Sequence, residues 1–205
     1  MSAFFDSWPG GVSDARLEQA LAATAEGDGA AVLALCEQII QDQPGAGAAY
    51  FLMASEYAAQ GEIERSEAAF WQAVLWMPDF PVARYQLGLL QYSSGRTAEA
   101  LVTWQPLLDL GEDNPLTHWV RGFGFLAQSQ LEVARLQFET GLACPVEHPP
   151  MAQDIQRILQ ALDGDISRQS DMIQPVADVS SERDEQAVEM SHVLLSRYRP
   201  EGPAH

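Results

Sequence analysis

A pattern of small, large apolar and turn residues repeats along this chain with a period of 34 positions. Gly27, Gly61 and Gly95 lie 34 residues apart, and Ser129 takes the next place in the series. Each of these has a small residue seven positions before it and an apolar or thiol side chain nine positions after it. The small residues are Ala20, Ala54, Gly88 and Gly122, and the later ones are Cys36, Phe70, Trp104 and Phe138. A fixed period of this length predicts an array of similar supersecondary units.

Each repeat is predicted to be a pair of helices. Apolar residues recur at three- and four-residue spacing on both sides of the glycine, which is typical of amphipathic helices. Glycine at the turn accepts a positive φ without strain. A small residue lets the two helices cross closely, and the late prolines Pro44 and Pro78 end the second helix. The sequence therefore predicts an all-α fold of stacked helical hairpins.

The predicted boundaries follow from this period. Four repeats tile residues 13–148 as 13–46, 47–80, 81–114 and 115–148, after an N-terminal aromatic extension at 1–12. Pro149-Pro150 begins a predicted capping helix at 149–164, which Gly164 ends. Residues 165–205 are predicted to be an acidic linker and an amphipathic tail helix at about 181–198. Pro106 should kink or shorten the helix expected at 97–110.

The residues of this pattern resemble the tetratricopeptide repeat (TPR) family. The resemblance covers residues 13–148 and is clearest in the two middle repeats. The outer repeats depart from it, with Ala23 in place of an aromatic residue, Val32 in place of a small one, and Ser129 at the turn. It implies a helical-hairpin solenoid that binds other proteins.

Charge limits the partners that this chain can bind. The formal net charge is −18, and all eleven Lys and Arg residues are arginine. Nucleic-acid binding needs a basic surface, so it is excluded, and anionic membrane surfaces are disfavoured. The charge favours either a basic partner or simple solvation of the exposed faces.

Cysteine content and the N-terminus predict a cytoplasmic protein. Cys36 and Cys144 lie three repeats apart, so a disulfide between them is not expected. The N-terminal segment has no apolar run typical of a signal peptide, and no stretch approaches the roughly 20 apolar residues of a membrane span.

The sequence gives no support for an enzyme, a metal site or a cofactor. Gly122-Phe123-Gly124 lies inside a predicted helix and lacks the lysine of a phosphate-binding loop. The four histidines, His118, His148, His192 and His205, have no metal-ligand spacing. We therefore expect binding rather than catalysis.

The TPR resemblance implies which residues line the concave groove. Most of these residues are apolar or aromatic: Phe51, Ser55, Tyr85, Leu89, Tyr92, Trp119, Phe123 and Leu126. If exposed, they would form a large apolar patch, which soluble monomers seldom leave bare. Two interpretations remain open at this point. The groove holds an apolar segment of another protein, or the chain's own ends cover it.

The candidate covering or docking residues lie at both ends of the chain. They are Phe4, Phe5 and Trp8 in the N-terminal extension, and Val188, Val193, Leu194 and Tyr198 in the tail helix. Such apolar side chains either pack on the array or bind a partner.

We therefore expect a cytoplasmic adaptor or chaperone that holds an apolar or basic segment of a client protein. A weaker resemblance, in architecture alone, is to the bacterial class II chaperones of type III secretion translocators. The alternative is a structural subunit of a larger assembly or a homo-oligomer, which would use the N-terminal aromatics and the tail helix.

Overall fold

The computed structural model describes residues 14–145 and 149–172, the last eight of them as backbone only, and this part of the chain is all-helical. The α-helices are α2 (Ala15–Glu26), α3 (Gly29–Asp42), α4 (Gly47–Ala59), α5 (Ile63–Trp76), α6 (Pro81–Ser93), α7 (Thr97–Trp104), α8 (Pro115–Leu126), α9 (Leu131–Ala143) and α10 (Pro149–Met172). A 3₁₀ helix, η1 (Gln105–Leu110), follows α7 directly. The predicted all-α fold is confirmed.

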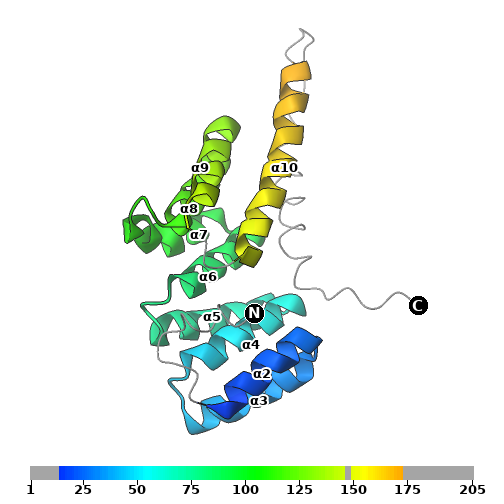
Figure 1. The fold of residues 1–205 in the computed structure, drawn as a ribbon, viewed down its shortest axis with the longest axis vertical. Coiled ribbons are helices and arrows are strands. Elements are labelled where there is room, and N and C mark those ends of the chain that lie inside the picture. The colour runs from blue at the N-terminus through cyan, green and yellow to red at the C-terminus, as the bar shows by residue number, and fades with distance from the viewer. Residues whose placement is uncertain (1–13, 146–148, 173–205) are drawn as a thin grey trace, which may run out of the picture. The chain divides into compact units, whose positions relative to one another are not determined.

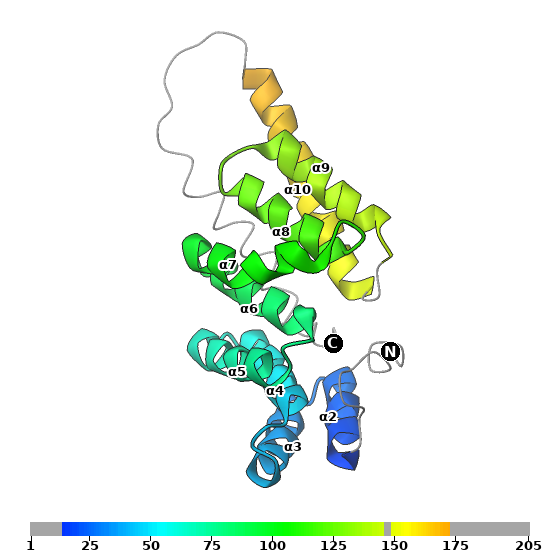
Figure 2. The same cartoon turned by 90° about the vertical axis from the view of Figure 1, so that its left-hand side faces the viewer.

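The described residues divide into two compact units, one ending at Gln91 and the other beginning at Tyr92. In the first unit α2 packs on α3 and α4 packs on α5, as Figures 1 and 2 show. In the second unit α8 packs on α9, and α9 also contacts α10. Antiparallel neighbours joined by short turns are the helical counterpart of a β-hairpin.

The 34-residue period is present in the backbone. Its turn residues Gly27, Gly61, Gly95 and Ser129 all have positive φ, of 75°, 76°, 77° and 60°. One hydrogen bond recurs behind three of them: Asp28 N–H donates to Ala23 O, Glu62 N–H to Tyr57 O and Gln130 N–H to Phe125 O, over 2.8 to 3.0 Å. This six-to-one bond is how a helix ends with a left-handed residue. The predicted turn positions are therefore confirmed.

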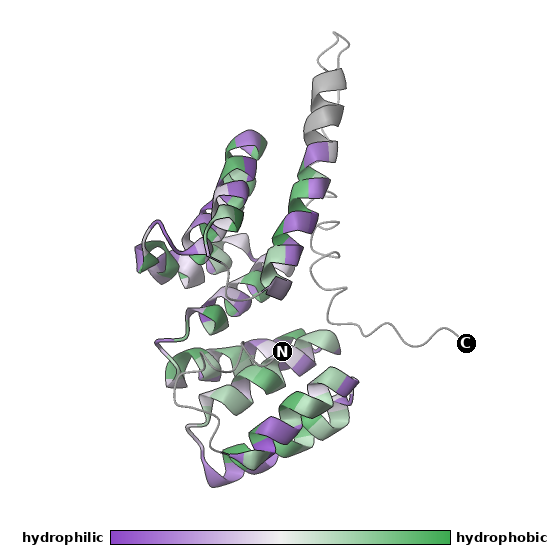
Figure 3. Ribbon diagram, in the orientation of Figure 1, coloured by the Kyte–Doolittle hydropathy of each residue, from purple (hydrophilic) through white to green (hydrophobic). Residues whose placement is uncertain are grey.

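The small and large positions of the period form the core. All eight of these residues are buried, and Ala20, Ala54, Cys36 and Phe138 are completely inaccessible. Burial raises the pKa of the Cys36 thiol to about 12, so the thiol stays protonated and unreactive. Both cysteines are free. Hydrophobic residues also run along α4 and α5, coloured green in Figure 3.

The last helix corrects a prediction. α10 continues through Gly164 to Met172, so the capping helix does not end at residue 164 and the linker does not begin at 165. A glycine ends a helix only when it takes a left-handed conformation, and Gly164 does not. The apolar side of α10 is buried as expected, through Met151, Ile155, Ile158 and Leu162.

The two terminal segments lie outside the described residues. These include the N-terminal extension with Phe4, Phe5 and Trp8, and the predicted tail helix with Val188, Val193, Leu194 and Tyr198.

Candidate functional site

The predicted groove residues are largely covered in this structure. Phe51, Tyr85, Leu89, Trp119, Phe123 and Leu126 are buried, while Ser55 and Tyr92 are half-buried. The apolar patch that these residues would form if exposed is therefore not accessible at six of the eight positions. Their binding of a peptide stays a prediction, because a partner would first have to reach them.

Aromatic packing explains the burial of Phe123 in the second unit. Its ring centroid lies 5.0 Å from that of Trp104, 5.0 Å from Tyr92 and 5.2 Å from Phe138. Stacked and edge-on rings at this spacing are favourable core contacts. Burial raises the pKa of Tyr92 to about 12. Phe123 thus belongs to the hydrophobic core of this unit.

Phe51 and Trp119 are held in a similar way. The ring of Phe51 contacts the rings of Phe70 and Phe80 edge-on, with centroids 5.7 and 5.4 Å away. Trp119 lies so close to Gly141 that a Cβ there would be 2.5 Å from its Cδ1 atom. Both side chains fill space between helices of their own unit.

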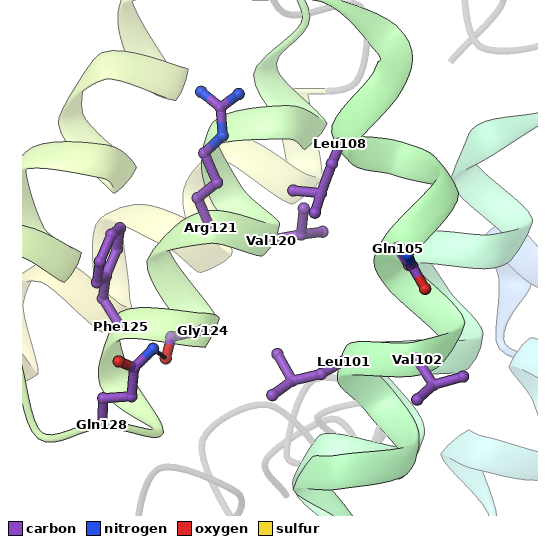
Figure 4. A pocket seen from close by; sticks show the side chains of 9 residues that line it. All are labelled: Leu101, Val102, Gln105, Leu108, Val120, Arg121, Gly124, Phe125 and Gln128. Carbon is purple, nitrogen blue, oxygen red and sulfur yellow. Dashed lines mark hydrogen bonds between the residues drawn. The ribbon is translucent and has the colours of Figure 1, made fainter.

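An open apolar cavity lies elsewhere in the second unit, between α7 and η1 on one side and α8 on the other. Its volume is about 490 Å³, within the usual range for binding pockets. The lining residues are Leu101, Val102, Gln105, Leu108, Val120, Arg121, Gly124, Phe125 and Gln128. Figure 4 shows Leu108 beside Val120, and Leu101 pointing from the α7 wall toward α8. Leu101, Val102 and Leu108 are exposed, at 38%, 72% and 40%, so the cavity is accessible to a partner.

Two local features create this cavity. Pro106 cannot donate a backbone hydrogen bond, and the helix continues past Trp104 only as the 3₁₀ helix η1. The hydroxyl of Thr117 in α8 donates to Leu107 O over 3.0 Å and fixes η1 in place. The other feature is Gly124, where a missing side chain leaves space opposite Leu101, since a Cβ there would lie 3.7 Å from Leu101 Cδ2.

Polar groups border the apolar walls. Arg121 donates two hydrogen bonds of 2.7 Å to the carboxylate of Glu112. The Arg121 guanidinium lowers the pKa of Glu112 and the carboxylate raises the pKa of Arg121, so the pair stays charged. The side-chain amide of Gln128 donates to Gly124 O over 3.0 Å (Figure 4). The charge of Arg121 is thus compensated within the chain, which leaves the walls suited to an apolar ligand.

His118, on α8, does not line the cavity. His118 is buried, with Nε2 2.8 Å from Glu112 O and Nδ1 3.2 Å from Gln137 Oε1. Its ring therefore links α8 to the turn after η1 and to α9. No group of three or more His, Cys, Asp or Glu side chains among the described residues could hold a metal ion.

Sequence reasoning missed this cavity, although its signals were present. Leu101 and Val102 stand next to the buried pair Thr103 and Trp104, so apolar residues face both sides of α7. Pro106 marks the point at which the regular helix ends. Neither signal by itself predicts a cavity, because the depth of the cavity depends on the position of α8, which forms its other wall.

Within the described part of the chain, no helix is both long and apolar enough to cross a membrane. No protein-family model matches the sequence, and no curated protein sequence matches it either.

Proposed function

We propose that this chain is a TPR-type protein-interaction module that holds an apolar segment of a client protein in the cavity between α7, η1 and α8. The observation that carries the proposal is an open cavity of about 490 Å³ bordered by exposed leucine and valine side chains. Soluble proteins seldom expose such surface without a partner. The 34-residue period of left-handed turns supports the TPR assignment.

The role that fits this module best is a cytoplasmic adaptor or chaperone. A cavity of this size accommodates a few apolar side chains, which suits a short segment of a client. The net charge of −18 favours a client that is basic overall, because opposite charges speed association. The aromatic groove residues would join the site only if their present contacts opened.

A structural subunit is the second candidate. Exposed apolar residues are also present on α9, as Val133 at 40% and Leu136 at 59%. A subunit of a larger assembly would bury several such surfaces at once.

The proposal is tested by a substitution that fills the cavity and is designed to leave the fold intact. Gly124→Leu places a side chain opposite Leu101 and removes space for a ligand, whereas Gly124→Ala adds only a Cβ at ordinary contact distance. Affinity capture from the cells that make this protein, with identification by mass spectrometry, compares wild type with both variants. We expect one stoichiometric protein to bind wild type and Gly124→Ala but not Gly124→Leu. Equal capture by all three would refute the cavity as the client site.

A further inference from the structure

A second uncovered apolar surface lies on helix α5 in the first unit. Among the described residues of that unit, the large apolar side chains left exposed are Trp71, Leu75 and Trp76, at 45%, 64% and 49%. All three belong to the last two turns of α5. Phe70 and Val74 of the same helix are buried.

Trp71 and Leu75 belong to one stripe of exposed residues along α5. Glu64, Ala68, Trp71 and Leu75 follow the spacing of one helix face, and all four are exposed. Ala68, which has a small side chain, lies between Glu64 at the acidic end of the stripe and Trp71 and Leu75 at its apolar end. We call these four residues the α5 stripe.

Trp76 flanks the stripe and is held in place. A Cβ on Gly45 would lie 3.3 Å from Trp76 Cε3, so this indole packs over the turn that precedes α4. It is therefore a fixed border, whereas Trp71 and Leu75 project from the helix.

The charges around the stripe indicate the kind of partner. In residues 14–91 there are 11 Asp and Glu residues and three arginines. Arg16 is engaged with Asp14 and Asp42, and Arg65 with Glu62. Glu64, in the first turn of α5, and Asp79, just after its end, have no ion-pair partner among the described residues. Carboxylates without an ion-pair partner among the described residues thus precede and follow Trp71 and Leu75 in the sequence.

We propose that the α5 stripe is a docking surface for a cationic amphipathic helix of another protein. Its apolar face would cover Trp71 and Leu75, and its arginine or lysine side chains would lie beside Glu64 and Asp79. Glu64 precedes Trp71 by two helical turns, about 10 Å along the axis, so the partner needs a basic residue about two turns from its apolar pair. Arginine would also bind favourably over the exposed indole of Trp71. A second copy of this chain is disfavoured, because each copy carries a net charge of −18.

This surface is independent of the cavity in the proposed function. The two lie in different units, and neither proposal needs the other to be true. A chain with both sites could hold two segments, of one partner or of two.

The experiment uses the full chain and a fluorescein-labelled 18-residue helical peptide. The peptide carries two leucines at i and i+4, with two arginines on the same face two turns away. A control peptide has glutamate in place of both arginines. Affinity is measured by fluorescence anisotropy, first at low ionic strength and then with added salt.

We expect the arginine peptide to bind and the glutamate peptide not to bind. Trp71→Ala and Leu75→Ala should each weaken binding about tenfold, as the truncation of an interface anchor does. Glu64→Gln should weaken binding less and should reduce its dependence on salt. Gly124→Leu should have no effect, which separates this result from the test of the cavity.

Leu136→Ala is the matched control, since Leu136 on α9 is a leucine of similar exposure, 59% against 64% for Leu75. Its affinity for the peptide should equal that of wild type. The proposal is overturned if the arginine peptide does not bind, or if Leu136→Ala weakens binding as much as Leu75→Ala. A dimer in native mass spectrometry that Trp71→Ala dissolves would also overturn it, because a second copy would then be the occupant.

Discussion

Gly122 and Gly124 are two residues apart in α8, yet a side chain would meet different surroundings at each. At Gly122 a Cβ would lie 2.6 Å from Cε1 of the Phe138 ring, which is closer than real atoms approach. At Gly124 it would meet only Leu101 Cδ2, at 3.7 Å. Neither glycine has a positive φ, so the contacts decide the effect of a substitution.

We predict opposite changes in stability at these two positions. Gly122→Ala should lower the free energy of unfolding by about 1–3 kcal/mol, because the buried Phe138 ring must move. Gly124→Ala should raise it by up to about 1 kcal/mol, since alanine favours the helix. Urea unfolding followed by circular dichroism measures both. Equal stabilisation by the two substitutions would contradict the close approach of α8 and α9 at Gly122.

The sequence identified one of these glycines and missed the other. Gly122 falls on the small position of the 34-residue period, which implied a close helix crossing. Gly124 has no place in the period. Its contribution to the cavity follows only from the position of Leu101 on the opposite wall.

At the scale of single elements, Asp14 caps the N-terminus of α2. Its Oδ1 atom accepts a hydrogen bond of 2.9 Å from the backbone N–H of Arg16, and its Oδ2 atom accepts one of 2.7 Å from the Arg16 guanidinium. The side-chain hydrogen bond from Arg16 is the main reason why the pKa of Asp14 is lowered. The residue therefore acts both as a helix cap and as a charge partner.

We predict that Asp14→Asn separates these two roles. Asparagine keeps an oxygen for the cap, so α2 should stay folded, but the variant loses the charge. Because the folded-state pKa of Asp14 is lowered, its stabilising effect is present above the unfolded value of about 3.9 and is lost as the pH falls through the folded value. The stability difference between wild type and Asp14→Asn should thus be largest near neutral pH and should vanish in acid.

Asp14→Ala is the companion variant, which removes the cap as well. It should increase amide hydrogen exchange in the first turn of α2, whereas Asp14→Asn should not. A difference between wild type and Asp14→Asn that stays constant between neutral pH and pH 3 would argue against the ion pair with Arg16.

Pro106 is a local signal that predicts the end of the regular helix at η1 but not the cavity beside it. Pro106 predicted an interrupted helix, and the structure confirms it at Gln105–Leu110. The cavity beside η1 could not be predicted in this way, because it needs Val120 and Gly124 from α8 as its other wall.

At the scale of the whole molecule, the net charge of −18 has a consequence for stability. Repulsion among many like charges destabilises a compact state, and salt screens it over a Debye length of about 10 Å at 0.1 M. We predict that added sodium chloride up to about 0.5 M raises the urea midpoint of unfolding. Exposed ion pairs such as Arg65–Glu62 oppose this trend, but each contributes at most about 1 kcal/mol.

The double variant Glu37→Gln with Asp109→Asn tests the cause. Both carboxylates are exposed and have no ion-pair partner among the described residues. Their removal should raise stability at low salt and reduce the gain from added salt. A urea midpoint that falls as salt is added would mean that ion pairs outweigh the repulsion.

The groove and the α5 stripe show what periodicity cannot predict. The family pattern placed Phe51, Trp119 and Phe123 on an open face, but each fills space among aromatic rings or against a glycine in its own unit. It gave no role to Trp71 or Leu75, which remain exposed. A helical repeat shows which residues share a face, whereas burial depends on the neighbouring elements.

The sequence by itself determined the all-α fold, the 34-residue period, the turns at Gly27, Gly61, Gly95 and Ser129, and the buried positions of that period. These follow from local physics, since backbone conformation and helix crossing depend on residue types at short range. Only the tertiary structure decided that six of the eight predicted groove residues are buried and that a cavity opens beside η1. These depend on contacts between segments far apart in the sequence, which periodicity does not encode.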